Sequence, residues 1–266
     1  MIRIQNKTKR TLTILFTLAF LVGIAFFVFY MIILVNLEQA RLYPVNSSYQ
    51  DTGDYKINSE TVLDDLDQGN TNVFMPITAT PEVGSMPTLS VGLYTWSQSD
   101  YLKVAEALNQ FVWKDDLKGW YLYSMYFYRG CQDNPAGFDA GEITYFKTFH
   151  GPFQYTARVV DIYPIGEAVS WGGNAIFPRP LHGWEYIDLQ KLEITADEAL
   201  KIAEEKEGQR FRLKVKNACT IDVFINPNPN QEISWKWHVF YNTNSLGVLL
   251  IQIDSGTGKA EIIRSD

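Results

Sequence analysis

The stretch ITADEALKIAEEKEG (residues 194–208) carries the signals of an amphipathic helix that begins after Thr195. Thr195 and Glu198 have the spacing of a capping box, in which each side chain binds the other residue's backbone N–H. The alanine and leucine residues that follow recur at helical spacing, and Gly208 is expected to end the helix. The stretch therefore predicts a helix that lies on a flat apolar surface.

The residues after this helix read as antiparallel strands. Apolar side chains take every second position from Phe211 to Ile225, interrupted only by Asn217, and again from Trp235 to Tyr241. The chain then closes with GVLLIQID, the turn SGTG and KAEIIR (residues 247–264), which read as two more strands. One helix on a sheet with a single apolar face makes a complete two-layer unit.

A similar order of elements precedes this unit. SQSDYLKVAEALNQFVW (residues 97–113) has apolar residues on one helical face, and a serine at position 97 or 99 can cap it. Strand candidates follow between residues 119 and 171. We therefore predict an α+β protein with two tandem helix-on-antiparallel-sheet modules, an aromatic-rich one over residues 92–185 and another over 186–266. Chance agreement of common α+β elements is the alternative.

Three features of the second unit belong to one pattern. They are the capped helix T-x-x-E-A-L-x-I-A that begins at Thr195, the strand WKWHVFYN (residues 235–242) and the hairpin I-D-x-x-T-G-K that ends at Lys259. In these features the chain from about residue 190 to 266 resembles the PepSY domain. The resemblance implies a small extracytoplasmic module with a binding or inhibitory role toward a protease, and it supplies no catalytic residue. The upstream unit, which departs from the pattern at helix and turn, is a possible second and divergent copy.

The opening of the chain is suited to a membrane. Four basic residues lie within residues 1–10, and residues 11–35 carry no charge. Because about 20 apolar residues cross a hydrocarbon layer of ~30 Å, we expect residues 11–35 to form a transmembrane helix in contact with membrane lipid. A cleaved secretory signal, with an apolar region of about 7 to 15 residues, is the alternative. The basic residues predict a single-pass protein with a cytoplasmic tail over residues 1–10 and an extracytoplasmic C-terminal domain.

Residues 36–91 differ in composition from the more apolar chain that lies C-terminal to them. They hold eight acids against Arg41 and Lys56, among many Asn, Ser, Thr and Pro, so we expect an acidic polar tether. The net charge is −7, and no basic region lies beyond residues 1–10. This charge distribution argues against a nucleic-acid partner.

Motifs of the common enzyme classes do not occur in the sequence. The three histidines have no partner at metal-ligand spacing, and no nucleophile elbow, phosphate-binding loop or dinucleotide fingerprint is found. Asp133, Asp139 and Glu142 lie in one loop, CQDNPAGFDAGE (residues 131–142), and leave a calcium site or a hydrolytic site as alternatives to a plain hairpin loop. We expect no catalytic residue, no cofactor and no metal ion.

Cys131 and Cys219 are the two cysteines of the chain. A disulfide between them would join the two predicted modules in an oxidising compartment. The alternative is that Cys219, on the apolar parity of its strand, is only a small buried side chain.

Aromatic residues crowd the segment WYLYSMYFY (residues 120–128), with large rings on both strand parities. One parity must cover the core, and the other is a possible interface, since Tyr and Trp favour protein interfaces. An aromatic core shared by two packed sheets is the alternative. The candidate interface residues are Trp120, Tyr121, Tyr123, Tyr126 and Tyr128.

Together these observations predict a membrane-anchored, non-enzymatic, extracytoplasmic protein-binding module, with a protease or another envelope component as its partner. The alternative is an accessory structural subunit of a larger membrane protein complex.

Overall fold

The computed structural model describes residues 15–32, 51–77, 96–131, 137–148, 154–178, 186–225, 235–243 and 246–265. The chain divides into two compact units, Met1–Asn46 and Ser47–Asp266. In the first unit, the helix Leu15–Ile32 is long and apolar enough to cross a membrane. The predicted basic tail, residues 1–10, lies outside the described residues.

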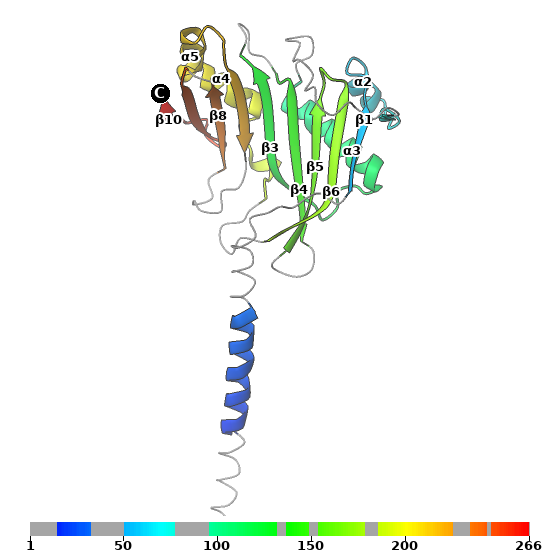
Figure 1. Ribbon diagram of the computed structural model, residues 1–266, viewed down its shortest axis with the longest axis vertical. Helices are drawn as coiled ribbons and strands as arrows, with labels where there is room; N and C mark the ends of the chain where they lie inside the picture. Colours follow the sequence, from blue (N-terminus) through cyan, green and yellow to red (C-terminus); the bar gives the residue numbers. More distant parts are fainter. Residues whose placement is uncertain are drawn as a thin grey trace, which may run out of the picture. The chain divides into compact units, whose positions relative to one another are not determined.

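The described strands of the second unit form one antiparallel sheet of ten strands, in the order β10-β9-β8-β7-β3-β4-β5-β6-β1-β2 (Figure 1). The strands are β1 (Asp51–Lys56), β2 (Met75–Pro76), β3 (Tyr121–Gly130), β4 (Ala140–Thr148), β5 (Gln154–Tyr163), β6 (Ala168–Pro178), β7 (Thr220–Ile225), β8 (Lys236–Asn242), β9 (Val248–Asp254) and β10 (Ala260–Ser265). The helices are α2 (Val62–Asp67), α3 (Gln98–Trp113), the short 3-10 turn η1 (Leu189–Lys191), α4 (Ala196–Ala203), the π-helical segment η2 (Glu204–Gly208) and α5 (Gln209–Lys214). The predicted α+β class, with antiparallel strands and an apolar helix near the N-terminus, is confirmed.

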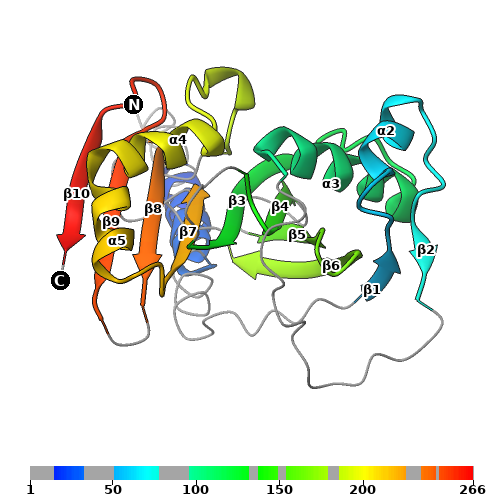
Figure 2. The same cartoon turned by 90° about the horizontal axis from the view of Figure 1, so that it is seen from above.

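The helices cover one face of this sheet (Figure 2). α3 packs on β4 and β5, and α4 packs on β7, β8 and β9. Their inward side chains and the alternate residues of the strands form one continuous apolar core, in which Leu108 and Trp237 are completely buried. We call the opposite face of the sheet the open face, because no described helix of the second unit packs on it.

The predicted division into two modules, residues 92–185 and 186–266, each with its own sheet, is not confirmed. β3 pairs antiparallel with β7 from Met125↔Ile225 to Gly130↔Thr220, so the strands that follow α3 and those that follow α4 continue into each other. Each half is still a helix followed by a four-stranded meander, and the first strands of the two meanders meet at the centre. The unpaired backbone groups of β3 and β7 would be costly at two internal edges, and their pairing removes both edges.

The two helices also meet at their N-terminal ends. The backbone N–H of Gln98 donates to the carboxylate of Asp197 at 2.9 Å. The N–H of Ala196 in turn donates to the side-chain oxygen of Gln98 at 2.7 Å. Both helices begin with a capping box, Ser97 with Asp100 and Thr195 with Glu198, as predicted for Thr195.

The prediction that Gly208 ends the second helix is wrong. The helical path continues through η2 and α5 to Lys214, and the strand begins only at Thr220. Phe211 and Val215, whose odd positions suggested a strand, lie one helical turn apart and are both buried. Gly208 is needed for another reason, since a Cβ atom at this position would collide with the Tyr241 hydroxyl.

The predicted tether, residues 36–91, is folded in its middle part. Residues 51–77 form β1, α2 and β2, and β1 pairs with β6 along its whole length. Ile57, Val62 and Phe74 enter the core from this segment. The average composition is polar, but these few apolar side chains are spaced so that all of them reach the same core.

Candidate functional site on the open face of the sheet

The open face carries a continuous row of side chains across the centre of the sheet. Directly opposite residues of antiparallel strands share a face, so the strand register identifies the members of this row. Tyr126 lies opposite Glu142 on one side and Phe224 on the other. The full row, from one end to the other, is Asp54, Ser170, Asp161, Glu142, Tyr126, Phe224, His238, Gln252 and Glu261.

A β-bulge gathers tyrosines of both parities on this face. The register of β3 with β4 shifts between Leu122 and Ser124, so that Tyr123 is an extra residue. Tyr121, before the shift, therefore shares the open face with Tyr126 and Tyr128 after it. The extra residue Tyr123 lies on the same face, because its ring stacks on that of Phe146, the residue opposite Tyr121. Tyrosines at both odd and even positions suggested a strand with large rings on both faces. In the structure they lie on one face, because the strand is irregular.

The fifth predicted interface residue, Trp120, makes a different contact. The guanidinium carbon of Arg158 lies 3.9 Å from the centre of the Trp120 ring. Arg158 is 8% exposed and forms an ion pair with Asp115 at 2.9 Å. Trp120 thus packs against a buried cation, while the four tyrosines form the group on the open face.

Aromatic rings stack along the row at the centre of the sheet. The rings of Tyr126 and Phe224 are 5.7 Å apart at an interplanar angle of 16°. Phe224 stacks in turn on His238 at 4.9 Å, and the Nε2 atom of His238 lies 2.8 Å from the side-chain nitrogen of Gln252. The ring of His238 is partly buried in this stack, and burial lowers its pKa.

Carboxylates lie next to the aromatic stack: Glu142 and Asp161 continue the row beyond Tyr126, and Asp222 lies opposite Tyr128. Burial, together with the charges of Glu142 and Asp54, raises the pKa of Asp161 to about 7. Burial also raises the pKa of Glu142 and that of Asp222, and hydrogen bonds from Thr144 and Tyr126 respectively oppose these shifts. Removal from water without a cation nearby makes the ionised carboxylates unfavourable, so a positive group placed here would stabilise them.

The open face therefore combines partly exposed tyrosine rings with carboxylates that lack a neutralising cation among the described contacts. Tyr126 remains 37% exposed. Lysine and arginine side chains bind both kinds of group, through ion pairs with carboxylates and through cation–π contacts with aromatic rings. The arrangement is suited to a positively charged polypeptide segment.

The two described carboxylates of the predicted acidic loop, Asp139 and Glu142, lie in different surroundings. Asp139 is 4% exposed and points inward, where its Oδ2 atom accepts the N–H of Gly130 at 2.8 Å. Glu142 belongs to the open face, and Asp133 lies outside the described residues. Among the described residues, no group of three or more His, Cys, Asp or Glu side chains could hold a metal ion.

Cys131 and Cys219 form a disulfide at the junction of the two halves of the sheet, with their Cα atoms 5.2 Å apart. They directly follow β3 and precede β7, and the N–H of Cys131 donates to the carbonyl of Cys219 at 3.0 Å. The bond therefore extends the β3–β7 ladder by one covalent link and holds the central strands that carry Tyr126 and Phe224.

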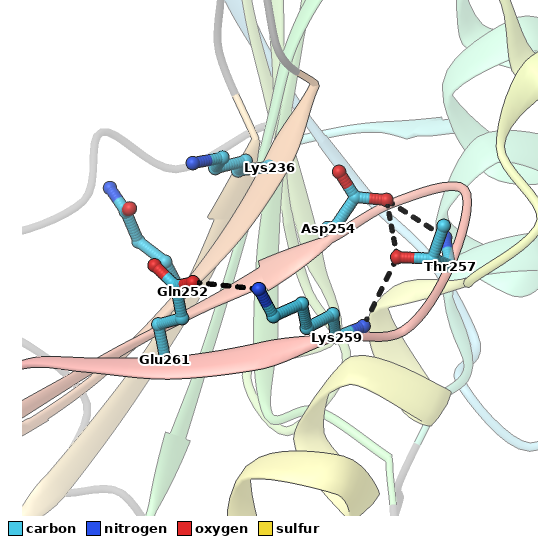
Figure 3. A pocket seen from close by; sticks show the side chains of 6 residues that line it. All are labelled: Lys236, Gln252, Asp254, Thr257, Lys259 and Glu261. Carbon is cyan, nitrogen blue, oxygen red and sulfur yellow. Dashed lines mark hydrogen bonds and ion pairs between the residues drawn. The ribbon is translucent and has the colours of Figure 1, made fainter.

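A shallow polar pocket of about 170 Å³ lies at the β10 end of the open face (Figure 3). Lys236, Gln252, Asp254, Thr257, Lys259 and Glu261 line it. The Asp254 carboxylate accepts hydrogen bonds from the backbone N–H and the hydroxyl of Thr257, both at 2.8 Å, and thereby stabilises the turn. This end of the face is of mixed charge, because the two lysines lie among the acids.

The buried charges on the helix side were missed by the sequence analysis. Glu204 in η2 accepts hydrogen bonds from the Nε and Nη2 groups of Arg212, the shortest at 2.6 Å, and another from the Tyr241 hydroxyl at 2.7 Å. Arg212 is 3% exposed. Glu204 and Arg212 are eight residues apart, which is not a recognised spacing of helical ion pairs, so the sequence did not indicate this pair. The hydrogen bonds connect α5 to β8 through Glu204.

No protein-family model matches this chain, and no curated protein matches its sequence.

Proposed function

We propose that this chain is a membrane-anchored, extracytoplasmic, non-enzymatic binding module whose open face holds a positively charged segment of a protein partner. The main observation in support of this proposal is the row of tyrosine rings and carboxylates centred on Tyr126, Glu142 and Phe224. Glu142, Asp161 and Asp222 each have a raised pKa because burial disfavours their charged form. A bound cation compensates that cost, which supports a cationic partner over an anionic one.

Two further observations support a position outside the cytoplasm. The helix Leu15–Ile32 has the length and apolar character of a membrane span. The disulfide between Cys131 and Cys219 belongs to an oxidising compartment. With the basic residues 1–10 on the cytoplasmic side, the disulfide and the open face would both lie beyond the membrane.

The repeated order of elements supports a relationship between the two halves. We propose that each half, a capped helix followed by a four-stranded meander, is one copy of a PepSY-like module, with the second copy at residues 186–266. This proposal makes a protease or another envelope component the expected class of partner.

Octalysine peptide is a suitable probe for the charge preference of the open face, with the full-length chain in detergent and titration calorimetry as the measurement. The triple variant E142Q/D161N/D222N removes three acids from the face. We expect it to weaken binding of the peptide at least about tenfold, because three ion pairs are lost.

The matched control is D64N/E193Q/E205Q, which changes the net charge equally but alters exposed acids in or next to the helices. It should leave the affinity within about twofold of the wild type. Equal weakening by both triple variants would show that only the net charge attracts the peptide, and it would contradict the proposed site.

A further inference from the structure

β10 is the outermost strand at one end of the sheet, and no described strand pairs with its outer edge (Figure 2). Its residues Ile262 and Ile263 are 44% and 50% exposed. The outer edge of a strand presents backbone N–H and C=O groups with which another strand can pair.

The corresponding strand in the other half of the sheet is covered. β6, the fourth strand of the first meander, pairs with β1 from Asp51↔Gly173 to Lys56↔Ala168. β10 is the fourth strand of the second meander, and it has no counterpart of β1 among the described residues. The repeated plan thus identifies the outer edge of β10 as the place where one more antiparallel strand can join.

The sequence of β10 is complementary to itself when two copies run antiparallel. In the segment Glu261-Ile262-Ile263-Arg264, the charges at the two ends are opposite and the two central residues are identical. Antiparallel pairing of two copies about the centre of this segment places each Glu261 opposite an Arg264 and each Ile262 opposite an Ile263. Opposite charges in directly facing positions stabilise a strand pair, and like charges destabilise it.

Such a pairing requires Glu261 and Arg264 to lie on the same face. Residues three apart in a regular strand lie on opposite faces. The β-bulge between Ile262 and Arg264 removes this mismatch, because Glu261 lies opposite Gln252 while Arg264 lies opposite Leu250, and both β9 residues belong to the open face. The irregularity of β10 therefore brings the two charges into the arrangement that a symmetric pair needs.

We propose that two copies of this chain associate by antiparallel pairing of their β10 strands, with Glu261 opposite Arg264 of the second copy. The pairing is isologous, with a two-fold axis perpendicular to the sheet. Such an axis keeps the open faces of both copies on the same side of one continuous sheet. Edges that are protected against pairing carry charges that repel a second copy. The β10 charges attract one, and the ion pair of Glu261 with Lys259 in its own chain is exposed and therefore weak enough to rearrange.

Charge reversal tests this pairing with its register. The full-length chain is studied in detergent, and light scattering gives the mass of the protein part. The wild type should be a dimer. E261R alone and R264E alone should each raise the dimer dissociation constant at least about tenfold, because each places like charges opposite one another in both pairs.

The two single variants should associate with each other when they are mixed. In the mixed dimer every introduced charge faces an opposite charge, and pull-down through a tag on only one variant detects it. The double variant E261R/R264E should also dimerise like the wild type. A control reversal on the helix side, E205R, should leave the mass unchanged.

A wild type that is monomeric at all concentrations would overturn the proposal. So would single variants that remain dimeric, since the association would then run through another surface such as the apolar helix. Failure of the mixed variants to associate would exclude the proposed register.

Discussion

Tyr126 of β3 lies directly opposite Phe224 of β7, and their rings stack 5.7 Å apart on the open face of the sheet. This contact crosses the junction between the two halves of the chain, which the Cys131–Cys219 disulfide also spans. The candidate binding face therefore exists only because the two halves share one sheet. Two separate modules would each present half of it.

The pKa of Asp161 predicts how stability depends on pH. Because this pKa is raised to about 7, the folded protein holds a proton that the unfolded chain has released at the same pH. The free energy of unfolding should therefore fall as the pH rises from about 4 to about 7. Asp161→Asn removes this dependence, and at pH 8 it should be about 1–2 kcal/mol more stable than the wild type, after allowance for solvent screening. Urea unfolding at several pH values measures the difference, which should vanish near pH 3.

Binding of a cationic partner should depend on pH in the opposite direction. Asp161 becomes charged as the pH rises through about 7, so the affinity for octalysine should increase between pH 5 and pH 8. Titration calorimetry in two buffers of different ionisation enthalpy should also detect proton release on binding at pH 6. If the affinity of a D161N variant for octalysine depends on pH as strongly as that of the wild type, groups other than Asp161 cause the pH dependence.

The ion pair of Glu204 and Arg212 should be important for stability because both side chains are nearly buried. Arg212→Met leaves Glu204 buried without its cation and should cost about 3–5 kcal/mol. Arg210→Met is a matched control on the same helix, since Arg210 is 83% exposed in its ion pair with Glu207. That change should cost less than about 1 kcal/mol. Equal losses in chemical unfolding would show that helix propensity, and not the buried pair, decides the result.

The disulfide closes a loop of 88 residues between Cys131 and Cys219. In the chain-entropy model its removal by C131S/C219S should lower the free energy of unfolding by about 4–5 kcal/mol. Reduction of the wild type should have a similar effect on thermal unfolding. If reduction leaves the unfolding midpoint unchanged, the bond is absent from the protein or the unfolded chain gains little freedom without it.

Loss of a capping box should lower the free energy of unfolding by a similar amount at α3 and α4, and by less than loss of the disulfide. Ser97→Ala and Thr195→Ala should each cost about 1 kcal/mol, because each leaves an N-terminal backbone N–H of its helix without its partner. Ser99→Ala is the comparison, because Ser99 is exposed and its hydroxyl lies 2.9 Å from that of Ser97, but it does not itself accept a backbone N–H of the helix, so this change should cost less. Unfolding by urea measures the stability of all three variants. If Ser99→Ala lowers the free energy of unfolding more than Ser97→Ala does, Ser99 and not Ser97 is the main cap of α3.

Local signals in the sequence sufficed for several elements. The spacing of Thr195 and Glu198 predicted a helix start that the structure confirms, and alternation predicted the strand that contains Trp237. These signals work because a capping box and a period of two act within a few residues. The uncharged opening segment is similarly recognisable, since its length alone suits a membrane span.

Features that depend on distant contacts could not be predicted in this way. The pairing of β3 with β7 depends on backbone groups, which carry no sequence signal, and it joins residues such as Tyr126 and Phe224 that lie far apart in the chain. The bulge at Tyr123 is one extra residue, and an alternating pattern with one shift resembles a strand that is apolar on both faces. Phe211 and Val215 are four residues apart, a spacing that fits both a strand and a helical turn.

Site-specific photo-crosslinking in intact cells tests the central claim most directly. A photoreactive amino acid is placed in the full-length chain at Phe224, on the open face, or at Lys201, which is exposed on α4. The account predicts a defined adduct with another polypeptide from position 224, its absence from position 201, and its loss when E142Q/D161N/D222N is added. An adduct that forms equally from both positions, or one that persists in the triple variant, would contradict a binding site made by the tyrosines and carboxylates of the open face.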